Sequence, residues 1–288
     1  MGREKVGRVQ DKVVLITGAA RGQGRSHAVK LAEEGADIIL FDICHDIDTN
    51  KYPLATSHDL TEAGLEVEKT GRRAVTAEVD VRDRAAVTRE LANAVAELGG
   101  HLDVVVANAG ICPLGTDVPI AGFIDAFDVD FVGVVNTLHA ALPYLKSGGS
   151  IITTGSIAGL IAGNQPAAGG PVGPGGAGYS FAKQLVDSYT RILAGQLAPM
   201  SIRVNVVHPS NCNTGMLNSD PMYKQFRPDL EHPTREDALP VFPLMQAMPV
   251  PYVEPEDVSA VVCFLASDES RYVTGSQFKV DAGAMLKF

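Results

Sequence analysis

The stretch "KVVLITGAARGQG", residues 12 to 24, decides the fold class of this chain. An apolar run ends at residue 17, glycines follow at 18, 22 and 24, and a helical pattern begins directly after them. Glycine lets the backbone turn sharply and approach a pyrophosphate, whose charge then meets the free N–H groups at the start of a helix. This order predicts a dinucleotide-binding unit, with a tight turn that binds no ligand as the alternative interpretation. The loop residues expected at the cofactor are Gly18, Arg21, Gly22, Gln23 and Gly24.

Apolar runs and helical patterns alternate along the rest of the chain. The apolar runs lie at 12–18, 36–42, 74–80, 102–110, 149–156, 202–209 and 277–283, and helical spacing covers 24–35, 84–99, 179–198 and 256–267. Continuous apolar strands are typical of a parallel sheet that helices cover on both faces. We therefore predict an α/β fold over residues 1–288: a single doubly wound Rossmann-type domain of about seven parallel strands, with residues 1–11 as an N-terminal extension.

Two segments interrupt this alternation. Residues 43–60 lengthen the crossover after the second strand, and residues 161–178 are rich in glycine, alanine and proline. Loops at the carboxyl ends of strands gather around the ligand, so we expect the first insert near the cofactor. The second is expected as a partly mobile loop beside the active site that controls access; a surface loop of drifted length is the alternative.

Composition and charge exclude several classes of function. The 24 Lys and Arg against 34 Asp and Glu leave a net charge of -10 with no basic cluster, so a nucleic-acid partner is not expected. The polar N-terminus and the absence of an apolar run of about 18 residues predict no signal peptide and no membrane span, hence the cytoplasm. Four cysteines lie far apart and predict no metal site or disulfide; we expect buried or pocket-lining thiols at Cys44, Cys112, Cys212 and Cys263.

Asp42 ends the second apolar run, 18 residues beyond Gly24. A carboxylate there can accept hydrogen bonds from the adenosine ribose and would repel a 2′-phosphate. No Lys or Arg follows until Lys51, so the sequence favours NAD over NADP, and Arg21 is the nearby basic residue that argues the other way.

Further cofactor contacts are expected where later strands end. Asp80 suits the adenine edge, although it could instead cap a helix that begins near residue 83. The "NAG" motif at 108–110 has small residues that permit close approach, and "HPSNCNT" at 208–214 ends the sixth strand. The complete set of these expected contacts is Ile43, Asp80, Val81, Asn108, Ala109, Gly110, Pro209, Asn211, Cys212 and Thr214, and Tyr179 and Lys183 are also expected to contact the cofactor.

These motifs together resemble the short-chain dehydrogenase/reductase family. "TGAARGQG" at 17, "DV" at 80, "NAG" at 108, "GS" at 155 and "YSFAK" at 179 occur in this order across nearly the whole chain. The insert after Asp42 and "RVNVVHPSNCNTGML" are similar to the carveol dehydrogenase-like, or mycofactocin-coupled, branch. The resemblance implies NAD-dependent oxidation of a secondary alcohol, an insert that holds NAD through turnover, and the redox cofactor mycofactocin as electron acceptor. It also implies that Pro209 and Thr214 bind the nicotinamide carboxamide.

The resemblance further implies a homotetramer. Its subunit contacts are expected at the helix over 180–198 and at the C-terminal "FKVDAGAMLKF". Apolar residues on two faces of that helix agree with this assignment, although burial against its own sheet explains much of the same pattern.

Oxidation of an alcohol needs a base for the hydroxyl proton, and Tyr179 is the candidate. A free phenol with a pKa near ~10 is a poor base unless positive charge stabilises the phenolate. Lys183 lies one helical turn later on the same face, where it can supply that charge and reach the nicotinamide ribose. Ser156, at the end of the fifth strand, would hydrogen-bond the substrate oxygen.

Asp130 departs from the family pattern. It aligns with an Asn that in the family helps a water relay to the lysine. A carboxylate could hold the same water, but it would also pair with Lys183, weaken the effect of that lysine and raise the pKa of Tyr179. Asn136 is an unlikely substitute, and we expect it to be a solvated or capping residue.

Apolar side chains near Ser156 and Tyr179 should line the substrate pocket, and they favour a hydrophobic cyclic or terpenoid alcohol or its ketone. Packing in the core is the alternative role for each of these candidates, which are Cys112, Leu114, Ile157, Leu160, Met216, Leu217, Met245 and Met248. Two other functions stay open: a reductase of oxoacyl or steroid ketones that uses free NAD(P)H, and a non-catalytic NAD-binding regulator. Intact Ser156, Tyr179 and Lys183 argue against the regulator.

Overall fold

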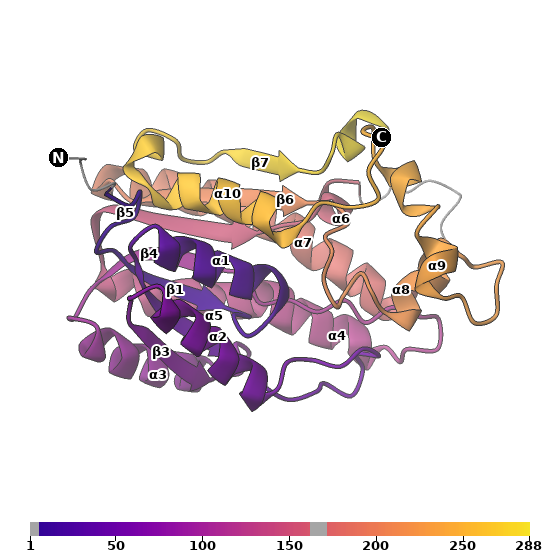
Figure 1. Cartoon of the computed structure of the whole chain (residues 1–288), viewed down its shortest axis with the longest axis horizontal. Helices are drawn as coiled ribbons and strands as arrows, with labels where there is room; N and C mark the ends of the chain where they lie inside the picture. The colour runs from indigo at the N-terminus through magenta and orange to yellow at the C-terminus, as the bar shows by residue number, and fades with distance from the viewer. Residues whose placement is uncertain (1–5, 162–171) are drawn as a thin grey trace.

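The computed structural model describes residues 6–161 and 172–288 (Figure 1). In this part of the chain, parallel strands form one seven-stranded sheet in the order β3-β2-β1-β4-β5-β6-β7, which confirms the predicted fold. The strand order reverses beside β1, where ligands bind in open sheets of this type. The strands are β1 (Val13–Thr17), β2 (Asp37–Asp42), β3 (Ala74–Glu78), β4 (Leu102–Ala107), β5 (Leu145–Thr154), β6 (Arg203–Pro209) and β7 (Gln277–Val280).

Helices cover both faces of the sheet. Side chains alternate along a strand, so Val14 and Ile16 of β1 face one layer while Val13 and Leu15 face the other. The first layer is α1 (Gly22–Glu33), α2 (Ser57–Lys69) and α10 (Pro255–Ala266); the second is α3 (Arg84–Glu97), α5 (Gly133–Ala141) and α7 (Gly173–Leu197). Figure 1 shows α1 and α10 in front of the sheet. Because both faces are buried, the central strands carry apolar residues continuously.

Short helices complete the fold, mostly at the carboxyl end of the sheet. They are α4 (Ala121–Phe127), α6 (Ile157–Leu160), α8 (Asp220–Phe226) and α9 (Arg235–Ala238). A π-helical turn, η1 (Asp128–Val132), joins α4 to α5. Five 3-10 turns are η2 (Leu142–Tyr144), η3 (Ala198–Met200), η4 (Phe242–Met245), η5 (Asp268–Ser270) and η6 (Ala284–Leu286).

Both inserts are shorter than predicted from sequence. The insert after β2 ends where α2 begins at Ser57, capped by Thr56 and Asp59, so residues 57–60 are helical. Residues 162–171 lie outside the described part of the chain, and with them most of the predicted mobile loop. Residues 173–178, which we expected in that loop, are instead the first turns of α7.

Close packing explains the glycines at the start of α7. A Cβ atom at Gly175 would lie 2.1 Å from the carbonyl oxygen of Pro113, and one at Gly178 would lie 2.5 Å from that of Phe123. Glycine therefore lets this helix approach the 113–123 segment, so the interpretation of these residues as pliable is wrong. The helix that carries Tyr179 is packed from its first turns.

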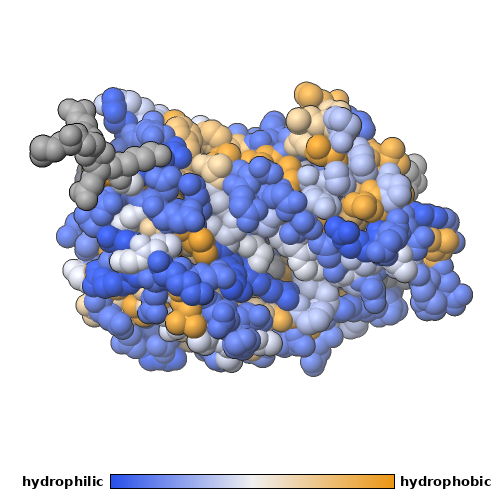
Figure 2. Space-filling model, in the orientation of Figure 1, coloured by the Kyte–Doolittle hydropathy of each residue, from blue (hydrophilic) through white to orange (hydrophobic). Residues whose placement is uncertain are grey.

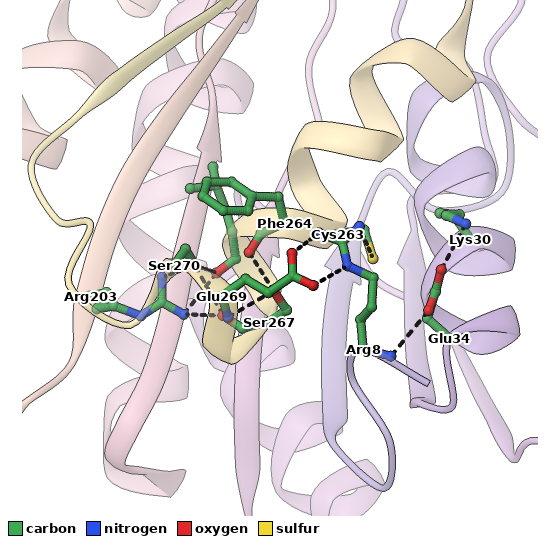
Figure 3. Close-up of polar contacts among 10 residues, drawn as sticks. Arg8, Lys30, Glu34, Arg203, Cys263, Phe264, Ser267, Glu269 and Ser270 are labelled. Atoms are coloured by element: carbon green, nitrogen blue, oxygen red, sulfur yellow. Dashed lines mark hydrogen bonds and ion pairs between the residues drawn. The ribbon is translucent and has the colours of Figure 1, made fainter. Parts of the chain in front are cut away.

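Hydrogen bonds and an ion pair link the segments at the amino end of the sheet (Figure 3). Arg8 pairs with Glu269, and its backbone N–H donates to Glu34 Oε2 at 3.1 Å. Nearby, Arg203 donates to Ser270 Oγ at 2.7 Å and to the Leu265 carbonyl at 2.8 Å. The predicted N-terminal extension thus docks on α1 and α10 from Arg8 onward, at the end of the sheet opposite the glycine loop. Among the described residues, no helix is long and apolar enough to cross a membrane.

Candidate active site

A cavity of about 550 Å³ opens at the carboxyl ends of the strands. It brings together the glycine loop, the ends of β2 to β6 and the start of α7. The predicted catalytic and cofactor-binding residues line it, with the exception of Gly24: Gly18, Arg21, Gly22, Gln23, Asp42, Ile43, Asp80, Val81, Asn108, Ala109, Gly110, Asp130, Ser156, Tyr179, Lys183, Pro209, Asn211, Cys212 and Thr214.

Gly24 supports the glycine loop from behind. A Cβ atom there would lie 2.0 Å from the carbonyl oxygen of Gly18, so a side chain cannot be accommodated. Gly18 and Gly22 have φ angles of +65° and +55°, which favour glycine. A Cβ atom on Gly18 would also lie 2.8 Å from Ala109 Cα. The loop therefore exposes backbone to the cavity, as a site for a pyrophosphate requires.

Asp42 ends β2 beside this loop. Its Oδ2 accepts a hydrogen bond from the Ala20 N–H at 2.9 Å. Burial raises the pKa of Asp42, while backbone N–H groups and the charge of Arg21 act in the opposite direction. Arg21 lies with its guanidinium carbon 6.0 Å from the centre of the Tyr52 ring. The carboxylate thus both holds the loop and lines the cavity.

The contacts at the turn after β3 differ from what the sequence suggested for Asp80 and Asn136. Asp80 is not the helix cap, because Asp83 Oδ1 accepts from the first N–H groups of α3. Asp80 instead pairs with Arg82 at 2.7 Å; burial raises the pKa of Asp80, but the hydrogen bonds and charge of Arg82 outweigh it, and the pKa is lowered. Asn136 is not solvated: it is buried and donates to the carbonyl oxygens of Val81 at 2.9 Å and Arg82 at 3.3 Å.

Ser156, Tyr179 and Lys183 meet in the cavity. Tyr179 is partly buried in the same cavity as Ser156, and Lys183 Nζ lies 5.6 Å from the centre of the Tyr179 ring. Lys183 is almost fully buried and donates to the carbonyl oxygen of Thr154 at 2.9 Å. Burial raises the pKa of Tyr179, as does Asp130, and the nearby Ser156 hydroxyl lowers it. The phenol of the protein alone is therefore protonated at neutral pH, and its ionisation needs further positive charge.

Asp130 pairs with Lys183, as the sequence predicted. Its Oδ1 lies 3.0 Å from Lys183 Nζ, and its Oδ2 accepts from the Ile111 N–H at 3.1 Å. Asp130 is fully buried in the π-helical turn η1, a distortion that frequently occurs at functional sites. Burial raises the pKa of Asp130 to about 6, against the opposing effects of Lys183 and Ile111.

This ion pair explains the glycine of the "NAG" motif. A Cβ atom on Gly110 would lie 2.5 Å from Asp130 Oδ1 and 3.3 Å from Lys183 Nζ. Gly110 is therefore needed to make room for the pair, in addition to any approach of a cofactor.

The insert after β2 covers one side of the cavity. The Tyr52 hydroxyl accepts a hydrogen bond from the Cys112 N–H at 3.1 Å, and Thr49 Oγ1 donates to Asp125 Oδ2 at 2.7 Å. An ion pair joins Lys51 to Asp117. The insert is thus fastened to α4 and to the segment that precedes it, and the lining side chains that it contributes are Ile43, Ile47, Tyr52, Leu54 and Ala55.

The opposite side of the cavity is mostly apolar. Of the predicted substrate residues, Cys112, Leu114, Ile157, Met216, Leu217 and Met245 line it. Leu160 and Met248 do not: Ala158 and Ile161 are the other lining residues around α6, and Met248 is 57% exposed on the surface. Sequence reasoning missed contributions from α8 and from the C-terminal segment, which are Met222, Gln225, Phe226, Lys287 and Phe288. The apolar spacing in "DPMYKQF" is the signal that could have indicated α8.

Comparison with known proteins agrees with this geometry. The family model described as enoyl-(acyl carrier protein) reductase matches residues 18–285. The chain is 44% identical to (-)-trans-carveol dehydrogenase of Rhodococcus erythropolis, over 97% of this chain and 99% of that protein. The chain belongs to the short-chain dehydrogenase/reductase family.

Two solved structures of short-chain dehydrogenases/reductases show the same fold. Carveol dehydrogenase from Mycobacterium avium in complex with NAD has a TM-score of 0.89 and 44% identity, covering 97% of this chain and 99% of its own. A short-chain dehydrogenase from Mycobacterium paratuberculosis bound to NAD has a TM-score of 0.83 and 37% identity, covering 97% and 100%. Among the described residues, no cluster of His, Cys, Asp and Glu could hold a metal ion, and the four cysteines are free.

Proposed function

We propose that this short-chain dehydrogenase/reductase is an NAD-dependent alcohol dehydrogenase that interconverts a hydrophobic cyclic secondary alcohol, of the carveol type, and its ketone. One observation carries the proposal: Ser156, Tyr179 and Lys183 share one cavity with the glycine loop. The NAD complex of the carveol dehydrogenase with the same fold supports the choice of cofactor and of substrate class. The apolar side of the cavity supports a hydrophobic substrate.

The residues present fit a dinucleotide. The glycine loop exposes backbone where a Cβ atom at Gly18 or Gly24 would clash, and Asp42 lies beside it. The loop would hold the pyrophosphate at the start of α1, Asp42 the ribose hydroxyls, and Lys183 the nicotinamide ribose. Bound NAD supplies the acceptor for the hydride and a positive charge beside Tyr179.

The chain itself handles the proton. Ser156 would orient the substrate oxygen by a hydrogen bond, and Tyr179 would remove the hydroxyl proton during oxidation. The two side chains line the same cavity, so the substrate oxygen would bind between them. Lys183 would stabilise the phenolate, while Asp130 partly offsets its charge. The enzyme is therefore expected to oxidise its substrate best above neutral pH.

A substitution of Asp130 tests how Lys183 and Asp130 together set the pKa of Tyr179. Replacing Asp130 by Asn removes a negative charge that raises the pKa of Tyr179, so the pH at which oxidation reaches half its maximum should move down by about one unit. Below pH about 6 the natural Asp130 also becomes neutral, and the two profiles should converge. Profiles of kcat/KM against pH check this. Asp128→Asn, in the same π-helical turn, is the matched control, and identical profiles for Asp130→Asn would contradict the prediction.

Asp42 provides a test of cofactor choice. Asp42→Asn keeps an acceptor oxygen for the Ala20 N–H but removes the charge that would repel a 2′-phosphate. Because hydrogen bonds to a charged group contribute about 1.5–3 kcal/mol, the Kd for NAD should rise at least about tenfold, and the preference over NADP should shrink. Titration of cofactor-free protein with both cofactors measures it. Asp48→Asn, an exposed position in the insert, should leave both constants unchanged; a Kd for NAD unaltered in Asp42→Asn would refute the assignment.

We further propose that the insert retains NAD between turnovers and that electrons pass on to mycofactocin. Support comes from the fastening of the insert, because the Tyr52 hydroxyl, Thr49 and Lys51 all contact residues between 112 and 125. Moving the insert away from the cavity requires these contacts to break. Tyr52→Phe loses the hydrogen bond from Cys112 and should release NAD faster during desalting than the natural protein.

The deciding experiment for the function uses protein purified without added cofactor. It is analysed for bound NAD and then offered cyclic secondary alcohols, either with an artificial electron acceptor or with free NAD. Turnover with the acceptor alone supports retained NAD; turnover with free NAD supports an ordinary exchanging dehydrogenase. Reduction of oxoacyl or steroid ketones with NADPH, and no alcohol oxidation, would favour the reductase alternative.

We propose a homotetramer, supported by two separate apolar surfaces. One lies on α4 and α7, where Ile120, Ile124, Phe181 and Ile192 are exposed and Phe181 stacks on Phe123 at 6.3 Å. The other includes the exposed Leu244, Met248 and Leu286 near the C-terminus, where Figure 2 shows hydrophobic side chains gathered at the upper right. Two self-complementary surfaces on one chain give a tetramer of D2 symmetry. A monomeric mass in sedimentation equilibrium would refute this.

A further inference from the structure

His208 is a buried titratable residue directly behind Ser156, and the proposed proton transfer does not use it. It lies near the end of β6 with no exposed surface. Its Nδ1 is 3.2 Å from the carbonyl oxygen of Ser156. The ring also packs on Gly155, where a Cβ atom would lie 2.5 Å from Nδ1. The imidazole therefore occupies the space beside the backbone that carries the Ser156 hydroxyl.

The polarity of this contact is fixed by its acceptor. A carbonyl oxygen can only accept, so the hydrogen bond requires the proton on Nδ1 of His208. Burial lowers the pKa of His208, while the Ser156 carbonyl and Asp187 act in the opposite direction. The ring is thus neutral at neutral pH and has a single proton, which the Ser156 carbonyl draws to Nδ1.

Asp187 lies beside the other edge of the ring without a hydrogen bond to it, because Nε2 has no proton to donate and no partner among the described residues. Its Oδ1 lies 3.4 Å from His208 Nε2, and the carboxylate is almost fully buried. Asp187 is fixed in turn by Gln277 of β7, which donates to Oδ1 at 2.5 Å, and by Arg191 at 3.2 Å. The ring of His208 is therefore held between α7, β7 and the end of β5, with little freedom to rotate.

One face of α7 packs against the end of β5. Tyr179, Lys183 and Asp187 follow each other at intervals of four residues and so lie on the same face. Tyr179 lines the cavity together with Ser156, and Lys183 donates to the carbonyl oxygen of Thr154. Asp187 lies on the far side of His208, 3.4 Å from Nε2. The third residue of the row thus packs beside the ring of His208, while the first two lie at the end of β5.

The Ser156 backbone has few other constraints on the side where α6 begins. Its carbonyl oxygen also accepts from the Gly159 N–H at 3.1 Å, and its Oγ accepts from the Ala158 N–H at 3.1 Å. Both partners belong to α6, a helix of a single turn that ends at Leu160. His208 is the partner that comes from the sheet, so it ties the serine to the rigid part of the molecule.

We propose that His208 is a positioning residue for the reaction: by donating from Nδ1 to the Ser156 carbonyl, it fixes the place of the Ser156 hydroxyl relative to Tyr179. This rests on the proposed function, in which Ser156 orients the substrate oxygen. Misplacing that hydroxyl weakens a hydrogen bond that matters most in the transition state, so kcat should change while cofactor binding does not.

Three substitutions of His208 distinguish the role of Nδ1 from that of Nε2. His208→Asn places an amide donor where Nδ1 lies, His208→Gln places one where Nε2 lies, and His208→Leu has neither. We expect kcat to fall about tenfold in His208→Leu and His208→Gln, the loss that one hydrogen bond accounts for, and to stay within about threefold in His208→Asn. The Kd for NAD should be unchanged in all three. A natural kcat in His208→Leu, or retention by Gln and not by Asn, would overturn the proposal; if the Leu variant does not fold, the Asn and Gln pair still decides.

A double-mutant cycle with Ser156→Ala excludes a merely structural role. If His208 acts through the Ser156 hydroxyl, His208→Leu should cost about tenfold in the natural background and nothing further when Ser156 is already Ala. An equal loss in both backgrounds would show that His208 acts elsewhere and overturn the proposal. Ser156→Ala alone tests the proposed function: natural activity in that variant refutes both, whereas its inactivity together with an unaffected His208→Leu refutes the positioning role only.

Discussion

Replacing Tyr179 by Phe should lower kcat for alcohol oxidation about a thousandfold, because the substrate proton loses its acceptor while the cavity keeps its shape. General acid–base catalysis contributes about 10²–10⁴-fold, so this loss corresponds to about 4 kcal/mol in the activation barrier. The substitution keeps the ring and leaves the glycine loop unchanged, so the Kd for NAD should change less than threefold. Steady-state kinetics and a cofactor titration on the same preparation measure both quantities.

A second tyrosine on the same helix is the control for this substitution. Tyr189 is ten residues further along α7, and its ring packs edge-on against Phe131 at 6.0 Å, away from the cavity. Tyr189→Phe keeps that packing and should have natural activity. If Tyr179→Phe retained more than about a tenth of the natural kcat, Tyr179 would not be the base, and the proposed proton transfer would have to be assigned to another group.

Replacing Lys183 by Met should damage both activity and stability. The phenolate loses its cationic neighbour, and Asp130 is left fully buried without the partner that lies 3.0 Å away. Removing one member of a buried ion pair costs about 3–5 kcal/mol. Burial already raises the pKa of Asp130 to about 6, and loss of Lys183 raises it further, so the folded variant binds a proton that the unfolded chain does not bind at neutral pH. Its stability should therefore fall as the pH rises from about 4 towards 8.

The double variant Lys183→Met with Asp130→Asn separates the two effects. The asparagine side chain would be neutral and could still accept from the Ile111 N–H, as Asp130 does at 3.1 Å. The free energy of unfolding, measured with urea, should recover most of the loss, and its added dependence on pH should disappear. Activity should stay at least a hundredfold below the natural enzyme, because the cation is still missing. Recovery of activity along with stability would show that Lys183 is a structural residue only.

The parts of this site that depend on local order were predictable from sequence. Strand, glycines and helix follow each other directly at Gly18 to Gly24, and Tyr179 and Lys183 share one helix face because they are four residues apart. The pairing of Asp130 with Lys183 could also be predicted, from the family pattern. Each of these inferences depends only on the conformation of one short segment, or on one contact between two residues that the family pattern already places together.

The parts that failed depend on contacts between distant segments. The cap of α3 is Asp83 rather than Asp80, because Arg82 folds back on Asp80 and engages its carboxylate. Asn136 is buried because the turn after β3 comes to lie over α5. The glycines at the start of α7 are packed against Pro113 and Phe123, a contact between segments far apart in the chain that glycine content alone cannot indicate. Context of this kind decides whether glycine serves mobility or close approach.

Different segments of the chain build the two sides of the cavity. In directed evolution, substitutions on one side should therefore have different effects from substitutions on the other. The dinucleotide side is built by strand ends and glycines that tolerate no added atom. The apolar side includes α8, η4 and the segment at Lys287, which is held to η4 by a hydrogen bond of 2.8 Å to the Leu244 carbonyl. Libraries confined to Met222, Phe226, Met245 and Phe288 should therefore contain many clones that fold, bind the cofactor and have an altered substrate range. Libraries at the strand ends should contain few clones that fold and bind the cofactor.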